Sequence, residues 1–334
     1  MTSNHHVSVV MTVLNEEKGL SQLLDTLVGQ SRQPDEIVIV DGGSTDGTLH
    51  LLERYAGNEP RLRIIRAPGV NIARGRNIGI AEAKGDIIAV TDGGCIPEGT
   101  WLEELLKKFT DSDIAAVAGS FRGEWTTTFE YYAALLAAPR EGRGTTEESP
   151  LFFGRSSAFR KLAWKEAGGY PEWLYTAEDT LFALRFKELG YRIASAPLAV
   201  VRWRPRPNLR KLAKMYFLYG RGNGRILLGS VRGSLYWMKY HAAWIGCLVG
   251  GMFFPLLWIP AVLVLTFLYL VAASPVLKEF RGECKSLLRE LYIPLIVLTR
   301  NITSNAGFLL GWWENRFRPE FRDCLERYRG VPES

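Results

Sequence analysis

The chain has 334 residues, of which 47% are hydrophobic and 23% charged, and it carries a formal net charge of +6. This length and apolar content exclude a disordered or fibrous protein and provide enough chain for a large core and a second region. Residues 1–200 contain 21 Lys/Arg against 27 Asp/Glu, whereas residues 201–334 contain 20 against 8, and such a basic half indicates an anionic partner.

The amino-terminal part alternates short apolar runs with amphipathic segments. Apolar runs typical of buried strands cover residues 7–13, 36–40, 62–65, 87–90 and 115–117. Between them, helical spacing of apolar residues predicts helices over residues 17–28, 48–55, 72–83 and 101–109. Unbroken apolar strands between amphipathic helices predict an α/β fold with a Rossmann-like, mostly parallel sheet flanked by helices.

Acidic and polar loops follow three of the predicted strands. They are Asn15-Glu16, the DGGSTDGT loop from Asp41 to Thr48, and the DGGC loop that begins at Asp92. Ligands of open α/β sheets bind at the carboxyl ends of the strands. Three acidic loops at one edge would repel each other without a cation or a set of hydroxyl donors, so we predict the site at this edge.

The DGGSTDGT loop allows two interpretations. Its carboxylates, Asp41 and Asp46, are placed to accept hydrogen bonds from ribose hydroxyls and from a base N–H. Alternatively, the loop is an ordinary Asp/Gly turn in which Asp46 caps the following helix. Capping and ligand binding are compatible with each other.

Four segments, in this order and spacing, resemble the family-2 glycosyltransferases of the GT-A fold. They are VSVVMTVLNEE, IVIVDGGSTDGT, ARGRNIGIAEAKGDIIAVTDGGC and AEDTLFALRFKELGYRI, and the resemblance covers about residues 5–205. It implies a GT-A sheet and a nucleotide-sugar donor. These motifs are specific for the family and not for the substrate.

The resemblance implies roles for several residues at the predicted edge. Glu16 and Asp41 match positions that contact the donor nucleoside, and Asp46 closes the same loop. Arg76, which is followed by Asn77, matches an element near the donor diphosphate. Asp92 matches the first Asp of the metal-binding DxD motif, as a ligand of Mg²⁺ or Mn²⁺.

Gly94 stands where the second Asp of that motif is expected. One carboxylate together with diphosphate oxygens still holds Mg²⁺, which keeps several of its waters. We therefore expect a divalent metal cofactor that is bound more weakly than by a complete motif. Cys95 is expected to be a small buried residue, because a hard cation prefers oxygen ligands.

Glu178 and Asp179 resemble the ED motif of the family. An acceptor hydroxyl must lose its proton as it attacks the anomeric carbon, and a positioned carboxylate serves as general base. The resemblance implies a single displacement that inverts the anomeric centre, with Asp179 as base and Glu178 in a positioning role. The alternative is that both acids only complement the amino terminus of a helix.

The segments 153–160 and 168–172 resemble the region beneath the acceptor. This resemblance implies acceptor contacts for Gly154 and Arg155. Trp173, like Trp164, is a candidate for stacking on a sugar, with core packing as the alternative for each. Residues 123–150 are polar and rich in Gly, Glu and Thr around 140–149, so we expect a mobile loop there.

Residues 202–239 contain ten Lys/Arg and no acid. Nucleic acid is a poor fit as the partner, because this basic segment leads directly into an apolar one. An amphipathic helix on anionic lipid headgroups is the simpler interpretation. Arg202 and Arg221 are candidates to clamp the donor diphosphate or a lipid phosphate.

Residues 240–277 contain no charged side chain over 38 positions. This length suffices for a transmembrane hairpin, with a turn near Pro255 and Pro260 and both basic flanks in the cytoplasm. A pair of core helices in a soluble domain is the alternative. A further apolar segment, residues 291–313, is interrupted by Arg300, Asn301 and Asn305, which favours an interfacial or re-entrant helix.

Cysteine usage and the amino terminus limit the compartment. The four cysteines form no CxxC motif, which argues against a zinc site and a disulfide framework. No basic stretch precedes the first apolar run, so no signal peptide is predicted and the catalytic region is expected in the cytoplasm.

We therefore predict four regions: a GT-A catalytic domain (1–200), a basic interfacial segment (201–238), a transmembrane hairpin (239–277) and an amphipathic carboxyl-terminal region (278–334). The predicted protein is an inverting glycosyltransferase at the cytoplasmic face of the cell membrane. Its partners would be a nucleotide-sugar, a glycan or lipid-linked acceptor and anionic lipids, in glycan, polysaccharide or glycolipid synthesis. A polyprenyl-phosphate sugar synthase and a non-catalytic membrane scaffold are the alternatives.

Overall fold

The computed structural model describes residues 5–137, 150–279 and 288–330. The chain divides into two compact units. The first comprises Met1–Glu124 and Ala138–Arg204, and the second comprises Trp125–Ala137 and Pro205–Ser334. The division after Arg204 lies close to the predicted end of the catalytic domain, but residues 125–137 belong to the second unit.

The first unit contains an eight-stranded mixed sheet in the order β3-β2-β1-β4-β7-β6-β8-β5. The strands are β1 (Val7–Val13), β2 (Glu36–Asp41), β3 (Leu62–Arg66), β4 (Ile87–Val90), β5 (Cys95–Pro97), β6 (Ile114–Gly123), β7 (Ser157–Arg160) and β8 (Arg192–Trp203). Neighbours from β3 to β4 are parallel, as are β6 and β8. Strand β7 is antiparallel to both of its neighbours, and β5 is antiparallel to β8. The α/β prediction is confirmed, and the parallel pairing is interrupted at β7.

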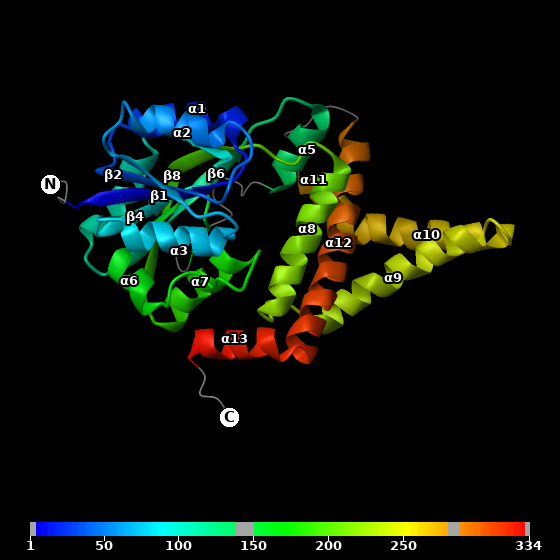
Figure 1. The fold of residues 1–334 in the computed structure, drawn as a ribbon. Coiled ribbons are helices and arrows are strands. Elements are labelled where there is room, and N and C mark those ends of the chain that lie inside the picture. The colour runs from blue at the N-terminus through cyan, green and yellow to red at the C-terminus, as the bar shows by residue number, and fades with distance from the viewer. Residues whose placement is uncertain (1–4, 138–149, 280–287, 331–334) are drawn as a thin grey trace. The chain divides into compact units, whose positions relative to one another are not determined.

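Helices cover both faces of this sheet (Figure 1). They are α1 (Glu17–Val28), α2 (Thr48–Ala56), α3 (Ile72–Glu82), α4 (Trp101–Leu106) with a 3₁₀ turn η1 (Lys107–Thr110), α6 (Lys161–Glu166) and α7 (Glu178–Glu188). Helices α1 and α2 lie on one face, and α3, α6 and α7 lie on the other. In α1 the four leucines at helical spacing, from Leu20 to Leu27, are all buried, as expected for an amphipathic helix on a sheet.

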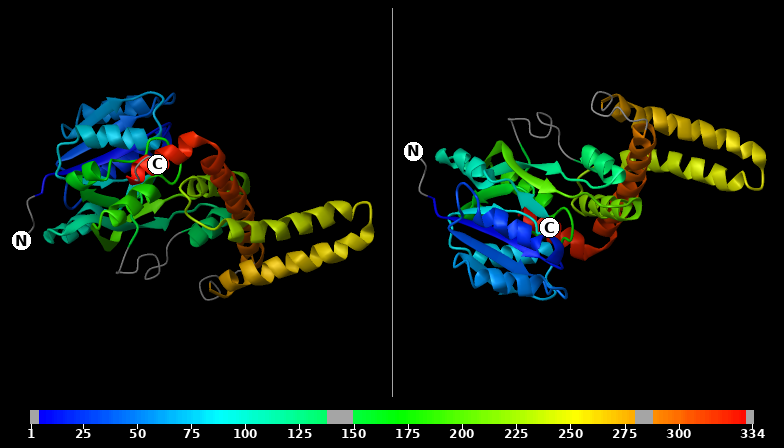
Figure 2. Two further views of the ribbon diagram at one scale, coloured as in Figure 1. Left: turned by 90° about the horizontal axis from the view of Figure 1, so that it is seen from below. Right: turned by 90° about the horizontal axis from the view of Figure 1, so that it is seen from above.

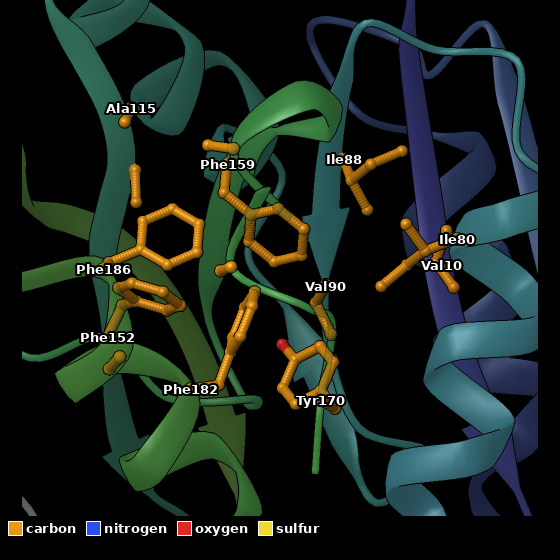
Figure 3. Close-up of a cluster of buried hydrophobic side chains, with 14 of the residues drawn as sticks. Val10, Ile80, Ile88, Val90, Ala115, Phe152, Phe159, Tyr170, Phe182 and Phe186 are labelled. Atoms are coloured by element: carbon orange, nitrogen blue, oxygen red, sulfur yellow. The ribbon is translucent and has the colours of Figure 1, made fainter. Parts of the chain in front are cut away.

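An aromatic cluster forms part of the core of this unit (Figure 3). The rings of Phe159 and Phe182 meet edge to face with centroids 5.4 Å apart, and Tyr170 lies 4.2 Å from Phe182. Phe152 and Phe186 complete the group. Because these rings come from α7, from β7 and from the loops beside them, their packing fixes the start of α7 relative to residues 152–159.

The second unit is helical. Its elements are α5 (Thr128–Ala137), α8 (Leu209–Arg225), α9 (Val231–Gly250), a 3₁₀ turn η2 (Pro255–Leu257), α10 (Trp258–Leu268), a π-helical turn η3 (Tyr269–Ala273), α11 (Ser274–Glu279), α12 (Arg289–Phe317) and α13 (Pro319–Arg329). Helix α5 corrects the expectation of a mobile loop over residues 123–150, since its ten residues are helical. Residues 138–149 of that loop lie outside the described residues.

Helices α9 and α10 run side by side as a hairpin, and Pro255 lies in the connection between them (Figures 1 and 2). Two stretches of the described chain are long and apolar enough to cross a membrane, Pro255–Lys278 and Glu290–Phe317, with mean hydropathies of 2.4 and 1.2. The second stretch belongs to the continuous helix α12, so the polar residues Arg300 and Asn301 do not break it, as a re-entrant loop would require.

Helices α8 and α12 approach each other at their backbones. A Cβ atom added at Gly220 or Gly224 would lie 2.1 or 2.2 Å from a carbonyl oxygen of α12, and one added at Gly307 or Gly311 would lie 2.1 or 1.9 Å from a carbonyl oxygen of α8. Both helices therefore present a Gly-xxx-Gly pair at this contact, which allows closer packing than any larger residue.

Candidate active site

The first two polar loops are joined by hydrogen bonds at the carboxyl edge of the sheet. The Asn15 N–H donates to Ser44 Oγ (2.9 Å), and the Thr45 N–H donates to Asn15 Oδ1 (2.8 Å). The Glu16 N–H donates to Thr48 Oγ1 at 2.9 Å. Asn15 adopts a left-handed φ of 58°, which an Asn tolerates better than most residues. The loops after β1 and β2 therefore form one structure.

Asp41 and Asp46 both organise the DGGSTDGT loop. The buried Asp41 carboxylate accepts hydrogen bonds from the Gly43 and Ser44 N–H groups and from Ser44 Oγ. Asp46 Oδ1 accepts from the Thr48 N–H (3.0 Å) and hydroxyl (2.6 Å) at the start of α2. The Thr48 hydroxyl is the main cause that lowers the pKa of Asp46. The N-cap of α2 is Gly47, so Asp46 forms a turn before the helix and is not its N-cap, and the predicted donor contacts stay open.

Arg76 lies at the centre of the candidate site. It is 1% exposed, and its Nη2 donates to Asp92 Oδ1 at 2.6 Å while its Nη1 donates to Glu178 Oε1 at 3.0 Å. Its guanidinium also lies over the ring of Tyr170, 5.2 Å from the centroid. Burial by itself would lower the pKa of Arg76, but the charge of Asp92 and the other acids raises it well above its usual range. Arg76 therefore stays charged and joins the DGGC loop to the ED motif.

The ED motif occupies the first turn of α7. Asp179 Oδ1 accepts from the Thr180 N–H (2.7 Å) and its Oδ2 accepts from the Gly154 N–H (3.2 Å). Burial is the main cause that raises the pKa of Glu178 to about 7, and the adjacent Asp179 adds to it while Arg76 opposes it. Ala177 precedes the motif with a left-handed φ of 66°, a strained conformation for alanine. Such strain is held by surrounding structure and is frequent at functional sites.

The guanidinium of Arg76 leaves no space for a side chain at Gly154. A Cβ atom at this position would lie 2.1 Å from Arg76 Nη2, so any side chain would displace the guanidinium. The next residue, Arg155, places its guanidinium 4.4 Å from the ring centroid of Trp203 and 5.0 Å from that of Phe121. Trp203 pairs with Cys95 across β8 and β5, so Arg155 lies beside the DGGC loop.

The structure also places three further predicted site residues: Arg202, Trp173 and Arg221. Arg202 lies on β8, pairs with Ile96 of β5 and forms an ion pair with Glu124 at 2.6 Å. Trp173 is half-buried, next to Glu172, whose carbonyl accepts from Asn71 Nδ2 at 2.6 Å. Arg221 lies on α8 in the second unit, where it forms an ion pair with the buried Glu314.

Two residues acquire roles that the sequence alone did not reveal. Tyr170 supplies the aromatic face beneath Arg76. Asn77 Nδ2 donates to the Tyr170 carbonyl and its Oδ1 accepts from the Tyr170 N–H, both at 2.8 Å, so its side chain holds the loop that carries this ring. The Trp164 indole N–H also donates to Asn77 Oδ1 at 3.2 Å, which favours packing over sugar stacking for Trp164. The sequence signal for this loop is the glycine pair directly before Tyr170, since Gly168 and Gly169 both adopt a positive φ.

The residues around Asp92 fit a weakly held divalent metal. No group of three or more His, Cys, Asp or Glu side chains among the described residues could hold a metal ion. The Asp92 side chain is 28% exposed, and its Oδ1 is the atom that binds Arg76. Next to it, a Cβ atom at Gly94 would meet only Glu16 Oε1, at 4.0 Å. Mg²⁺ is commonly held by one or two carboxylates together with substrate phosphates and water, and this arrangement of donors suits that case.

The comparisons with known proteins show the class of the fold. The fold is similar to that of a mannosyltransferase from Pyrobaculum calidifontis, solved in complex with GDP-Man and Mn²⁺. The TM-score is 0.58 at 20% identity, and the match covers 95% of this chain and 88% of that chain. The first unit therefore has the GT-A fold. Residues 8–167 match the model of glycosyl transferase family 2.

The chain is also similar to curated proteins, among them a rhamnosyltransferase. The chain is 27% identical to the O-antigen chain rhamnosyltransferase WbaN of Salmonella anatum, over 56% of this chain and 62% of that protein. It is 28% identical to the succinoglycan biosynthesis protein ExoA of Rhizobium meliloti, over 66% and 69%. The chain thus spans about three fifths to seven tenths of these relatives. Residues 8–167 of the chain carry the glycosyl transferase family 2 domain.

Proposed function

We propose that this protein transfers a sugar, with inversion, from a nucleotide-diphosphate sugar to a hydroxyl acceptor at the cytoplasmic face of a membrane. The observation that carries the proposal is the position of Arg76 between Asp92 and Glu178, at 2.6 and 3.0 Å. This contact brings the donor-side loop and the carboxylate pair of α7 to one place. A non-catalytic scaffold would not need a buried guanidinium shared among acids, because such a group is costly to bury.

Asp179 is the general base in this proposal. It accepts the proton of the acceptor hydroxyl while that oxygen forms its bond to the anomeric carbon and the bond to the diphosphate oxygen breaks on the opposite face. Two backbone N–H groups, of Gly154 and Thr180, fix its carboxylate. Glu178 is held by Arg76 and is a positioning residue.

The donor lies along the edge formed by the first three loops. Glu16 and Asp41 bind the nucleoside, Asp46 supports their loop, and Arg202 contributes positive charge near the diphosphate. Asp92 would hold Mg²⁺ or Mn²⁺, which offsets the charge of the diphosphate when bound. The similarity to the Pyrobaculum calidifontis mannosyltransferase, which was solved with GDP-Man and Mn²⁺, supports this arrangement.

Gly154, Arg155 and Trp173 bind the acceptor in this proposal. The names of the relatives, an O-antigen rhamnosyltransferase and a succinoglycan biosynthesis protein, support a glycan or lipid-linked acceptor in polysaccharide or glycolipid synthesis. The two membrane-length apolar stretches support anchoring in the cell membrane. The basic residues of α8 and its flanks would then bind anionic lipids, and Arg221 stays a candidate for phosphate binding.

The Asp179→Asn variant tests the base. We expect transfer to fall by about 10²–10⁴-fold, the usual contribution of a general base. Donor binding, measured by calorimetry with Mn²⁺ on a panel of UDP-, GDP-, dTDP- and CMP-sugars, should change little. Asp113→Asn is the matched control, because Asp113 is an exposed partner of Arg192.

Three outcomes would revise the proposal. Transfer at the wild-type rate in Asp179→Asn would reject Asp179 as base. If only polyprenyl phosphate accepts sugar and the variant retains that activity, the protein is a polyprenyl-phosphate sugar synthase, because a phosphate needs little deprotonation. If the wild-type protein neither binds nor turns over any donor of the panel, the alternative of a non-catalytic membrane scaffold is favoured.

A further inference from the structure

Two adjoining cavities lie in the second unit, one between α9, η3 and α12 and the other between α8, α9 and α12. One measures about 380 Å³ and is lined by Trp237, Ala272, Val297, Arg300, Asn301, Ser304 and Asn305. The other measures about 360 Å³ and shares Trp237, Ser304 and Asn305 with it. Both volumes fall within the range of about 300–1,000 Å³ that is typical of small-molecule sites. The proposed sugar transfer uses neither cavity.

Arg300 gives the first cavity a positive charge. It lies within the apolar stretch Glu290–Phe317, about 15 Å along the helix from Glu290 at 1.5 Å per residue. No carboxylate lines either cavity, and no described residue forms an ion pair with the Arg300 guanidinium. A charged side chain within a membrane-length helix requires a partner and usually marks a functional site.

Asn301 adds neutral donors beside this charge. The Trp244 indole N–H donates to His241 Nδ1 (3.3 Å), so the neutral imidazole carries its hydrogen on Nε2 and donates to Asn301 Oδ1 at 2.9 Å. Asn305 Nδ2 donates to the same oxygen at 3.2 Å. With its oxygen occupied in this way, Asn301 has its amide N–H groups left to offer to a ligand. Guanidinium and amide donors together are complementary to a phosphate.

The surroundings favour a phosphate that is attached to a lipid. Apolar side chains on the hairpin are widely exposed, among them Met252 (76%), Val262 (59%) and Leu263 (64%). The second cavity is lined by hydroxyl and amide groups, including Asn223, Ser230 and Ser234. Such a lining suits the hydroxyl-bearing part of a lipid headgroup, such as glycerol.

We propose that this double cavity binds the phosphate headgroup of a membrane lipid. Arg300 and Asn301 contact the phosphate, and the hydroxyl-bearing part of the headgroup occupies the second cavity. This site is independent of the sugar-transfer reaction, so the two proposals fail separately.

The test is native mass spectrometry of the full chain in detergent, with phosphatidylglycerol added. We expect Arg300→Gln and Asn301→Asp each to retain about tenfold less lipid, as for the loss of a charge-assisted hydrogen bond. Asn301→Asp keeps the acceptor oxygen for His241 and removes the donors. Arg316→Gln is the matched control, because it removes the same charge from an exposed position on the same helix.

The source of the phosphate is tested separately. Phosphatidylcholine should bind less than phosphatidylglycerol, and inorganic phosphate in excess should not raise the unfolding temperature as the lipid does. Arg300→Lys, which keeps the charge, should retain the preference for phosphatidylglycerol. Equal lipid retention by Arg300→Gln, Asn301→Asp and the wild type would overturn the proposal, and so would full stabilisation by inorganic phosphate. The unfolding temperature of each variant without lipid shows whether the variant is folded.

Discussion

Arg76 is one cation among three carboxylates: Asp92, Glu178 and Asp179. The cluster therefore carries net negative charge when every acid is ionised. Glu178 is the most completely buried of these acids, at 6% exposed, and this burial raises its pKa. A proton on Glu178 relieves both the burial of its charge and the repulsion by Asp179.

This raised pKa predicts how stability depends on pH. The pKa of Glu178 is about 7 in the folded protein, against 4.5 for an ordinary glutamate. Between these values the folded state binds the proton more tightly than the unfolded state, so stability falls as the pH rises through this window. The loss is on the order of 3 kcal/mol.

Glu178→Gln should remove most of this dependence, because the amide does not titrate. Thermal unfolding at about pH 5 and about pH 8 measures this dependence of stability on pH. Glu82→Gln, at an exposed carboxylate on α3, is the control. The same pH slope in Glu178→Gln and in the wild type would show that another group is responsible.

Gly94 leads to a prediction about the metal. The space beside it is open, so Gly94→Asp should fit and add a carboxylate next to Asp92 and Glu16. We expect Mn²⁺ to bind about tenfold more tightly in the presence of donor, because the charge of the ligands sets cation affinity. Calorimetry measures this, with Gly99→Asp as a control that adds the same charge at another open position. Unchanged affinity would place the metal away from this loop.

At the scale of elements, the contact between α8 and α12 is sensitive to single methyl groups. Gly311→Ala would place a Cβ atom 1.9 Å from the Arg221 carbonyl oxygen, so one helix backbone must move. We expect a loss of about 1–3 kcal/mol, as for other overpacked contacts. Gly246→Ala on α9 meets nothing within 4 Å and should be neutral or stabilising, since Ala is the better helix former. Thermal unfolding in detergent compares the two, and equal unfolding temperatures would contradict the close packing.

Local patterns predicted most elements of the first unit. The spans of β1 and α1 are those expected, because buried apolar runs and leucine spacing are local signals. Strands β5, β7 and β8 were missed. Strands β5 and β7 have only three or four residues, which carry too little pattern, and Pro197 interrupts the pattern of β8. Helix α5 was missed because the Gly- and Thr-rich residues around it dominate the composition.

The sequence motifs named the residues of the candidate site, but they did not predict the contacts between those residues. Motifs identified Arg76, Asp92, Glu178 and Asp179. No local pattern indicates that Arg76 bridges Asp92 and Glu178, since Arg76 and Glu178 are 102 positions apart. The partner of Arg221 was likewise unpredictable, because Glu314 lies 93 positions away on another helix.

At the scale of the whole molecule, the second unit combines excess basic charge with apolar surface. The turn of the hairpin exposes Phe253 (76%) and Leu256 (79%). We expect the protein to stay in the membrane pellet after washes with high salt and with alkaline carbonate, because insertion of apolar helices, unlike binding to anionic lipids, does not depend on screening. Release by salt alone would show that only the basic residues hold the protein to the membrane.

The long-range contact of Arg76 also limits the order of events during synthesis. Asp92 follows it by 16 residues, whereas Glu178 follows by 102. A nascent chain that has folded only through β5 therefore holds Arg76 with one of its two ion-pair partners, Asp92. The residues of the candidate site come together only after α7 has left the ribosome and closed this loop, so the proposed sugar transfer would report on folding of the chain through α7.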